Sequence, residues 1–218
     1  PYMEDAAQKT RAQDELPQSA GGRTITTTEP KFIPQEAVEL KLAGEVTIRV
    51  RLVDCVGFMV EGAAGHLEDG AERLVKTPWY DHEIPFTQAA ELGTRKVITD
   101  HSTIGVVVTT DGSFSDLPQE TYLDAENQAI SELKKLHKPF LVLVNSSHPS
   151  SRTAREAAER IEKQHSVTAM PVNCAQLSEE DIRQIMEQIL YEFPVSRVEF
   201  YMPKWVEMLP FSHPLKTG

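Results

Sequence analysis

Apolar and polar residues alternate in two short stretches near the start of the chain, at residues 37–42 and 46–53. Both stretches are rich in β-branched residues, and Gly44 lies between them. A period of two is typical of strands, and a glycine between two such runs indicates a turn. The pattern therefore predicts a β-hairpin that enters a sheet.

Further along the chain, segments with helical spacing alternate with short apolar runs. The predicted helices span residues 86–98, 119–136 and 153–164, and the apolar runs that follow them span 104–108, 140–144 and 167–172. A last helix is predicted at 179–190, where Ser178 and Asp181 have the spacing of a capping box with Asp in place of Glu. Helices that alternate with buried strands predict an α/β fold, with a mostly parallel sheet and helices on both faces.

Two other segments interrupt this alternation. Residues 57–85 are rich in Gly, charged and aromatic residues, and loops of this length are usually functional or partly structured. Residues 195–202 alternate like a strand, and Pro203, Pro210 and Pro214 follow. We therefore assign 1–192 to one main domain and 193–218 to the start of a following middle domain or a linker.

Composition narrows the range of functions. The 218 residues carry a formal net charge of -11 and no run of Lys or Arg, which argues against a nucleic-acid partner. Cys55 and Cys174 lie in predicted buried segments, which suits packed thiols in a reducing cytoplasm. The seven histidines are scattered, without the spacing of metal ligands, so we assign no metal site to them.

The strongest candidate for chemistry is Asp54, which ends an apolar run and is followed three positions later by Gly57. An Asp-x-x-Gly segment at a strand end resembles the Walker B strand of GTPase-like proteins. There the carboxylate holds the water shell of Mg²⁺, and the glycine N–H approaches the γ-phosphate. A turn that simply ends a strand is the alternative reading of the same residues.

Thr27 and Thr28 lie in a threonine-rich loop upstream of the predicted hairpin. A switch threonine reports the γ-phosphate through its backbone N–H and Mg²⁺ through its hydroxyl. The two residues are candidates for this role, with Thr28 as a possible metal ligand, and a plain polar loop is the alternative.

Asn145 follows the predicted strand at 140–144, where guanine-specific proteins carry Asn-Lys-x-Asp. The chain has Asn145-Ser146-Ser147-His148 instead, without the Lys and the Asp that read guanine. Guanine selection therefore loses its hydrogen-bonding basis, and ATP is the favoured nucleotide. A structural role for Asn145 in a turn remains open.

A phosphate-binding loop of the form G-x-x-x-x-G-K-[ST] is missing from residues 1–36, where only Gly21-Gly22-Arg23-Thr24 is remotely similar. We expect residues that precede Pro1 to supply this loop, together with the first strand. Since the loop provides several transition-state donors, we expect no ATP hydrolysis by the chain alone.

Several longer strings together resemble the stage IV sporulation protein A family, the spore-coat morphogenetic ATPases of endospore-forming bacteria. They are RAQDELPQS at 11–19, TTEPKF at 27–32, RLVDCVG at 51–57, TPWY at 77–80, HSTIGVV at 101–107 and YEFPV at 191–195. The resemblance covers nearly the whole chain. It implies a GTPase-derived P-loop NTPase domain, with Asp54 as the Walker B aspartate and Thr27 and Thr28 as sensor threonines.

The resemblance also implies a biological setting. ATP hydrolysis would drive self-polymerisation into the basement layer of the coat, on the mother-cell side of the outer forespore membrane. A small amphipathic membrane-bound protein would recruit the polymer, and other coat proteins would join it. Two alternatives remain: a non-catalytic scaffold that keeps the hydrolase fold and uses loop 57–85 for partners, and a regulatory GTPase.

Overall fold

The computed structural model describes residues 9–10, 31–42, 46–63, 65–68, 70–194, 205, 209–210 and 213. The predicted sensor threonines Thr27 and Thr28 lie outside the described residues, as does the predicted tail strand at 195–202.

A parallel sheet forms the centre of the fold. Its strands are β7 (Gly105–Thr110), β8 (Phe140–Asn145) and β9 (Ala169–Val172), in the order β7-β8-β9. The prediction of parallel strands is confirmed for these three. Their carboxyl ends are in register, with Thr110 opposite Asn145 and Asn145 opposite Val172.

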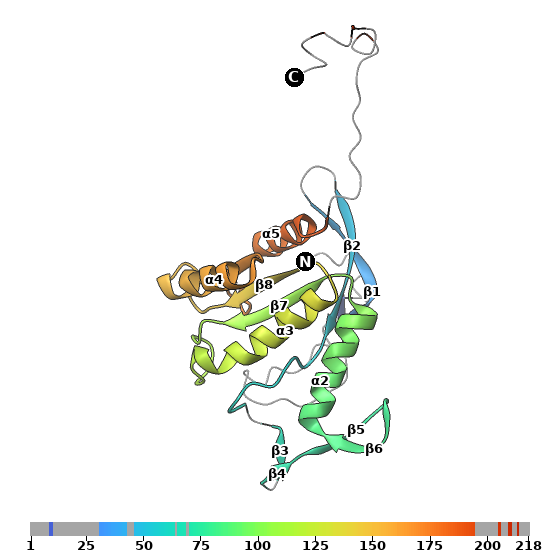
Figure 1. Cartoon of the computed structure of the whole chain (residues 1–218), viewed down its shortest axis with the longest axis vertical. Coiled ribbons are helices and arrows are strands. Elements are labelled where there is room, and N and C mark those ends of the chain that lie inside the picture. Colours follow the sequence, from blue (N-terminus) through green and yellow to red (C-terminus); the bar gives the residue numbers. More distant parts are fainter. Residues whose placement is uncertain are drawn as a thin grey trace.

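Helices pack on both faces of this sheet (Figure 1), so every apolar side chain of β8 is buried. On one face, Val142 and Val144 pack with residues of α3 (Leu123–Lys135) and α4 (Arg152–His165). On the other face, Leu141 and Leu143 pack with α5 (Glu179–Tyr191). A strand that alternates its side chains between two helical layers is expected to be apolar throughout.

The predicted hairpin is confirmed, but its predicted entry into the main sheet is not seen among the described residues. Strand β1 (Lys31–Lys41) pairs antiparallel with β2 (Thr47–Asp54), and the pairing register shifts between Ile33 and Val38. Within the described residues the two strands form a sheet of their own, separate from the parallel one.

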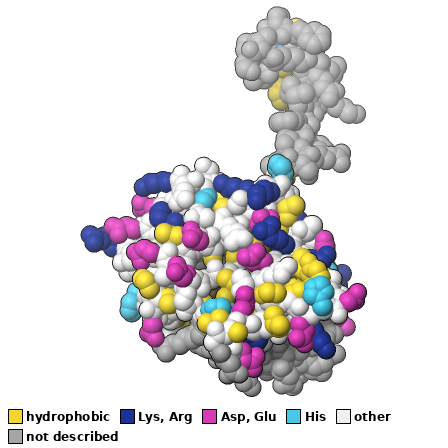
Figure 2. Space-filling view, turned by 60° about the horizontal axis from the view of Figure 1, so that its bottom comes forward, with side chains coloured by type: hydrophobic (Ala, Val, Ile, Leu, Met, Phe, Trp, Pro, Cys, Tyr) yellow, Lys and Arg dark blue, Asp and Glu magenta, His cyan; other side chains and the backbone are white. Residues whose placement is uncertain are grey.

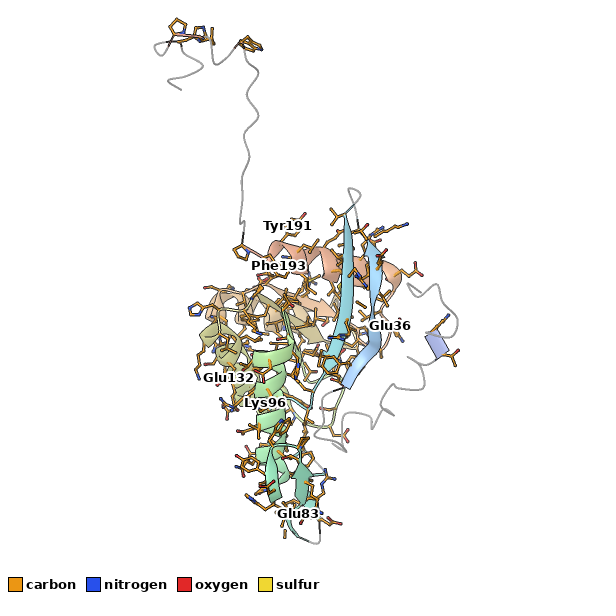
Figure 3. The ribbon with its side chains drawn as sticks, turned by 90° about the vertical axis from the view of Figure 1, so that its right-hand side faces the viewer. Glu36, Glu83, Lys96, Glu132, Tyr191 and Phe193 are labelled. Atoms are coloured by element: carbon orange, nitrogen blue, oxygen red, sulfur yellow. The ribbon has the colours of Figure 1, made fainter. Side chains whose placement is uncertain are left out.

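The long segment that follows β2 is partly structured, as its length suggested. It holds two small antiparallel pairs, first β3 (Leu67–Glu68) with β4 (Ala71–Glu72), then β5 (Leu74–Thr77) with β6 (Tyr80–Pro85). In Figure 3 the β5–β6 hairpin, marked by Glu83, lies at the end of α2 far from Tyr191.

Helix α2 (Phe86–Lys96) leads from this hairpin to the central sheet and continues as a π-helical turn, η2 (Val97–His101). Its buried residues include Phe86, Ala90 and Thr94. A short 3-10 turn, η3 (Gln119–Tyr122), precedes α3.

The start of α5 confirms the predicted capping box. The Ser178 hydroxyl accepts from the backbone N–H of Asp181 at 3.1 Å, and the Asp181 carboxylate accepts from the backbone N–H of Ser178 at 2.8 Å. This reciprocal pairing satisfies two N–H groups that a helix N-terminus otherwise leaves open.

Candidate functional site

The carboxyl ends of β7 and β8 carry a polar network. Ser146, which is fully buried, donates from its hydroxyl to Asp111 Oδ2 at 2.6 Å. The other carboxylate oxygen of Asp111 accepts from the backbone N–H of Ser113 at 3.0 Å, and Ser113 Oγ in turn accepts from the backbone N–H of Ser147. The network joins the two loops at the edge where α/β sheets bind ligands.

Asp111 is held as a carboxylate by this network. Burial raises the pKa of its carboxyl, but the hydrogen bonds from Ser113 and Ser146 outweigh burial and place the pKa below its ordinary value.

Asn145, the predicted base-binding residue, ends β8 and is half-buried. Its Oδ1 accepts from the backbone N–H of Cys174 at 2.9 Å, which fixes the loop after β9 to the end of β8. The side-chain oxygen therefore has a structural task here, in line with the turn alternative.

A pocket of about 390 Å³ opens beside these loops. It is lined by residues from the loops after β8 and β9 and from the first turn of α5, namely Ser147, His148, Pro149, Ser150, Asn173, Gln176 and Asp181. Neutral hydroxyl and amide groups predominate, with one carboxylate, so the pocket offers both donors and acceptors to a polar ligand.

Asp54 is the last residue of β2, and its side chain is exposed. In the hairpin it lies opposite Lys31. Gly57 follows with φ +86, a backbone conformation that favours glycine. Asp54 thus ends β2 and Gly57 lies in the loop that follows it, whereas Asn145 belongs to the parallel sheet.

Three residues that hold the candidate loops were not singled out from the sequence: Thr94 at the Gly57 loop, and Asp111 and Ser146 at the ends of β7 and β8. Thr94 forms hydrogen bonds with the backbone of Gly57, and Asp111 and Ser146 form the network described above. A threonine inside a helix has no local feature that shows which loop it will meet. The Thr-Asp-Gly string after the β7 run was the only available signal for Asp111.

The described residues were also compared with the requirements of a metal site and of a membrane-spanning helix. In the part of the chain that the structure describes, no three His, Cys, Asp or Glu side chains are grouped so that they could hold a metal ion. No helix among the described residues is long and apolar enough to cross a bilayer. On the face shown in Figure 2, acidic and basic side chains are interspersed with small hydrophobic groups.

Fold and loops together define an α/β domain whose polar loops gather at the carboxyl ends of a parallel sheet. The profile of the family described as stage IV sporulation protein A, ATPase domain, matches residues 1–194. The chain therefore belongs to the stage IV sporulation protein A family, and this part of it corresponds to the ATPase domain of the family.

Curated relatives agree with this assignment. The whole chain aligns with proteins named stage IV sporulation protein A from Clostridioides difficile (strain 630), at 46% identity, and from Bacillus anthracis and Bacillus subtilis (strain 168), each at 42%. In each case it covers 44% of the relative, so the chain spans less than half the length of these proteins.

Proposed function

We propose that this chain is the ATPase domain of a sporulation protein that hydrolyses ATP with Mg²⁺ and uses the energy to polymerise around the forespore. The observation that carries the proposal is the family match together with the exposed Asp54 at the end of β2 and Gly57 three positions later. A carboxylate at that position suits the water shell of a metal ion that bridges phosphates.

One set of candidate residues would contact the phosphates and the metal ion, and another set would contact the base. Asp54 would hold Mg²⁺ through water, and the Gly57 N–H would donate to the γ-phosphate. Thr27 and Thr28 would act as sensors of the γ-phosphate, with the Thr28 hydroxyl as a further metal ligand. Mg²⁺ would neutralise charge on the β- and γ-phosphates. Asp54 fits this ion because its carboxylate is exposed, and Mg²⁺ usually takes one or two carboxylates along with phosphate oxygens and water.

The base would lie at the end of β8, where the pocket beside His148 offers room and polar groups. Ser146 and His148 stand where a guanine-reading protein has Lys and Asp, which supports ATP over GTP as the nucleotide. Asn145 would contribute by holding the loop after β9 through Cys174.

A further strand with the phosphate-binding loop would complete the domain beside β7. Val106 and Val108, on the face of β7 opposite Val107, are 40% and 59% exposed. A strand beside β7 would pair with its edge, because β7 ends the order β7-β8-β9 among the described residues. The exposed valines suit a helix that would cover their face of the sheet. We expect no turnover by the chain without that loop.

The proposed setting is the mother-cell cytoplasm, at the outer forespore membrane. Membrane association would be peripheral, through a small amphipathic anchor protein, and the polymer would bind further copies of itself and other spore coat proteins. The family name and the relatives' names support the sporulation role. The net charge of -11 argues against nucleic acid as a partner.

The decisive experiment compares ATP turnover and sedimentation of the full-length protein with those of Asp54→Asn and of Thr27→Ala/Thr28→Ala. Loss of one transition-state contributor is expected to lower turnover by about 10²-fold or more. We expect the threonine double variant to lose ATP-dependent sedimentation. Asp81→Asn, an exposed carboxylate in β6, is the matched control and should behave as wild type.

Each outcome decides between the alternatives. Unchanged turnover in Asp54→Asn would overturn the site assignment. Assembly without any turnover in the wild-type protein would favour a non-catalytic scaffold on a hydrolase fold. Tighter binding of GTP than of ATP would favour a regulatory GTPase.

A further inference from the structure

One buried hydroxyl forms hydrogen bonds with both backbone polar groups of Gly57. The Gly57 N–H donates to Thr94 Oγ1 at 3.0 Å, and the Thr94 hydroxyl donates to the Gly57 carbonyl at 3.1 Å. Thr94 lies on α2, 37 residues away along the chain, and is 4% exposed. A contact between distant segments that satisfies a donor and an acceptor at once fixes the orientation of that peptide.

The same loop is held firmly on both sides of Gly57. Asp54 ends β2 on one side, and on the other side Phe58 is buried in the main hydrophobic cluster. Arg95, the neighbour of Thr94, lies over the Phe58 ring at 5.8 Å and forms an ion pair with Glu132 of α3 at 2.9 Å. The residues on both sides of Gly57 are therefore anchored to other elements of the fold.

Space is left at the Cα of Gly57. A Cβ atom built there would meet no heavy atom within 4 Å among the described residues, although the residue is only partly exposed. Burial raises the pKa of the Cys55 thiol, and hydrogen bonds with Thr94 and the Gly57 backbone partly offset this effect. The loop thus packs on α2 through the backbone of Gly57.

Building on the proposed function, we propose that Thr94 is a positioning residue. Its hydroxyl accepts from the Gly57 N–H in the absence of nucleotide, and the γ-phosphate of ATP replaces it as the acceptor. The N–H that a γ-phosphate requires is the one that Thr94 already accepts. Since one N–H makes one well-aligned hydrogen bond, the two acceptors compete. ADP has no γ-phosphate and leaves the Thr94 contact in place, so ATP would break this hydrogen bond and ADP would not.

The competition predicts a specific effect of removing the hydroxyl. Thr94→Val keeps the shape of the side chain but frees the Gly57 N–H, so an ATP analogue no longer has to displace a partner. We expect the ratio of the Kd for ADP to the Kd for a non-hydrolysable ATP analogue to rise about fivefold, the equivalent of one neutral hydrogen bond. A general loss of folded protein would change both constants equally and leave the ratio unchanged.

The test is equilibrium binding of Mg-ADP and of the non-hydrolysable Mg-ATP analogue to the full-length protein and its Thr94→Val and Thr94→Ser variants. Thr94→Ser retains the hydroxyl and should keep the wild-type ratio. Thr77→Val is the matched control, because the buried hydroxyl of Thr77 in β5 has no hydrogen-bond partner within the part of the chain that the structure describes.

The outcomes separate this proposal from the proposed function. An unchanged or lowered ratio in Thr94→Val, with the wild-type protein still binding both nucleotides, would overturn the role of Thr94 and leave the ATPase assignment intact. If the wild-type full-length protein binds neither nucleotide, the proposed function fails, and the role of Thr94 fails with it.

Discussion

The hydroxyl of Ser146 donates to the carboxylate of Asp111 at 2.6 Å and so joins the loops that follow β8 and β7. Ser146 is fully buried, and its Oγ also accepts from the backbone N–H of His148 at 3.1 Å. The Ser146 hydroxyl thus links the two loops on this edge of the sheet, together with the hydrogen bond from the Ser147 N–H to Ser113 Oγ.

Removing that hydroxyl is expected to destabilise the protein. Ser146→Ala should lower the free energy of unfolding by about 1.5–3 kcal/mol, since a hydrogen bond to a charged group is lost and the Asp111 carboxylate loses a donor. Urea denaturation measures the change. Ser147→Ala is the control, because Ser147 bonds to Ser113 through its backbone N–H rather than its hydroxyl. Equal losses in both variants would contradict this role of Ser146.

Asp111 should also make stability depend on acid pH. Burial raises the pKa of its carboxyl, but hydrogen bonds from Ser113 and Ser146 place that pKa below the ordinary value of about 3.9. A carboxyl with a depressed pKa in the folded state contributes stability above its unfolded pKa, and that contribution is lost as pH falls through the folded pKa.

We therefore expect the unfolding free energy of the wild-type protein to fall more steeply below about pH 4 than that of Asp111→Asn, which has no carboxylate to protonate. Denaturation curves recorded between neutral pH and pH 3 provide the comparison. Parallel pH profiles for the two proteins would show that protonation of Asp111 does not affect the free energy of unfolding.

Glu126 of α3 and Arg160 of α4 form an ion pair in which the carboxylate is buried and the Arg160 side chain is 31% exposed. Arg160 donates through Nη1 and Nη2 to the two carboxylate oxygens at 2.8 and 3.1 Å, and the hydroxyl of Thr109 on β7 donates to Oε2 at 2.8 Å. The Glu126 side chain is 1% exposed, so its charge has no access to bulk water.

Arg160→Met leaves this carboxylate buried without a counter-charge and should lower the free energy of unfolding by about 3–5 kcal/mol. The double variant Glu126→Met/Arg160→Met replaces both charges by apolar groups and should recover most of the loss. Lys163→Met, from an exposed i,i+4 pair with Glu159 on the same helix, is the control, with an expected change below about 1 kcal/mol. A double variant no more stable than Arg160→Met would contradict the account.

The sequence predicted the local parts of this fold well, for physical reasons. Helices and strands depend on periodicity within one segment, so β8 and α4 were found within one or two residues of their bounds. The Ser178–Asp181 capping box is also local, and it was predicted from a spacing of three.

Contacts between distant residues could not be predicted in the same way. Glu126 and Arg160 are 34 residues apart, and Thr94 and Gly57 are 37 apart, so neither pairing leaves a periodic trace. For the same reason, Asn145 could be placed at a strand end, but the use of its Oδ1 to hold Cys174 could not be foreseen.

Gly112, in the turn after β7, offers a test of backbone crowding near the site. Its φ of +86 favours glycine, and a Cβ atom at this position would lie 3.2 Å from the backbone nitrogen of Gln119. Gly70, between β3 and β4, has a similar φ of +80, but a Cβ atom there would meet no heavy atom of the described residues within 4 Å. Both positions carry the cost of a left-handed residue, about 1–2 kcal/mol for alanine, but only Gly112 adds a clash with backbone that cannot rotate away.

Gly112→Ala should therefore lower the free energy of unfolding by about 1–3 kcal/mol more than Gly70→Ala, measured by urea denaturation of the two variants side by side. Equal costs at the two glycines would show that the turn after β7 yields at Gln119 and does not constrain the loop that holds Asp111.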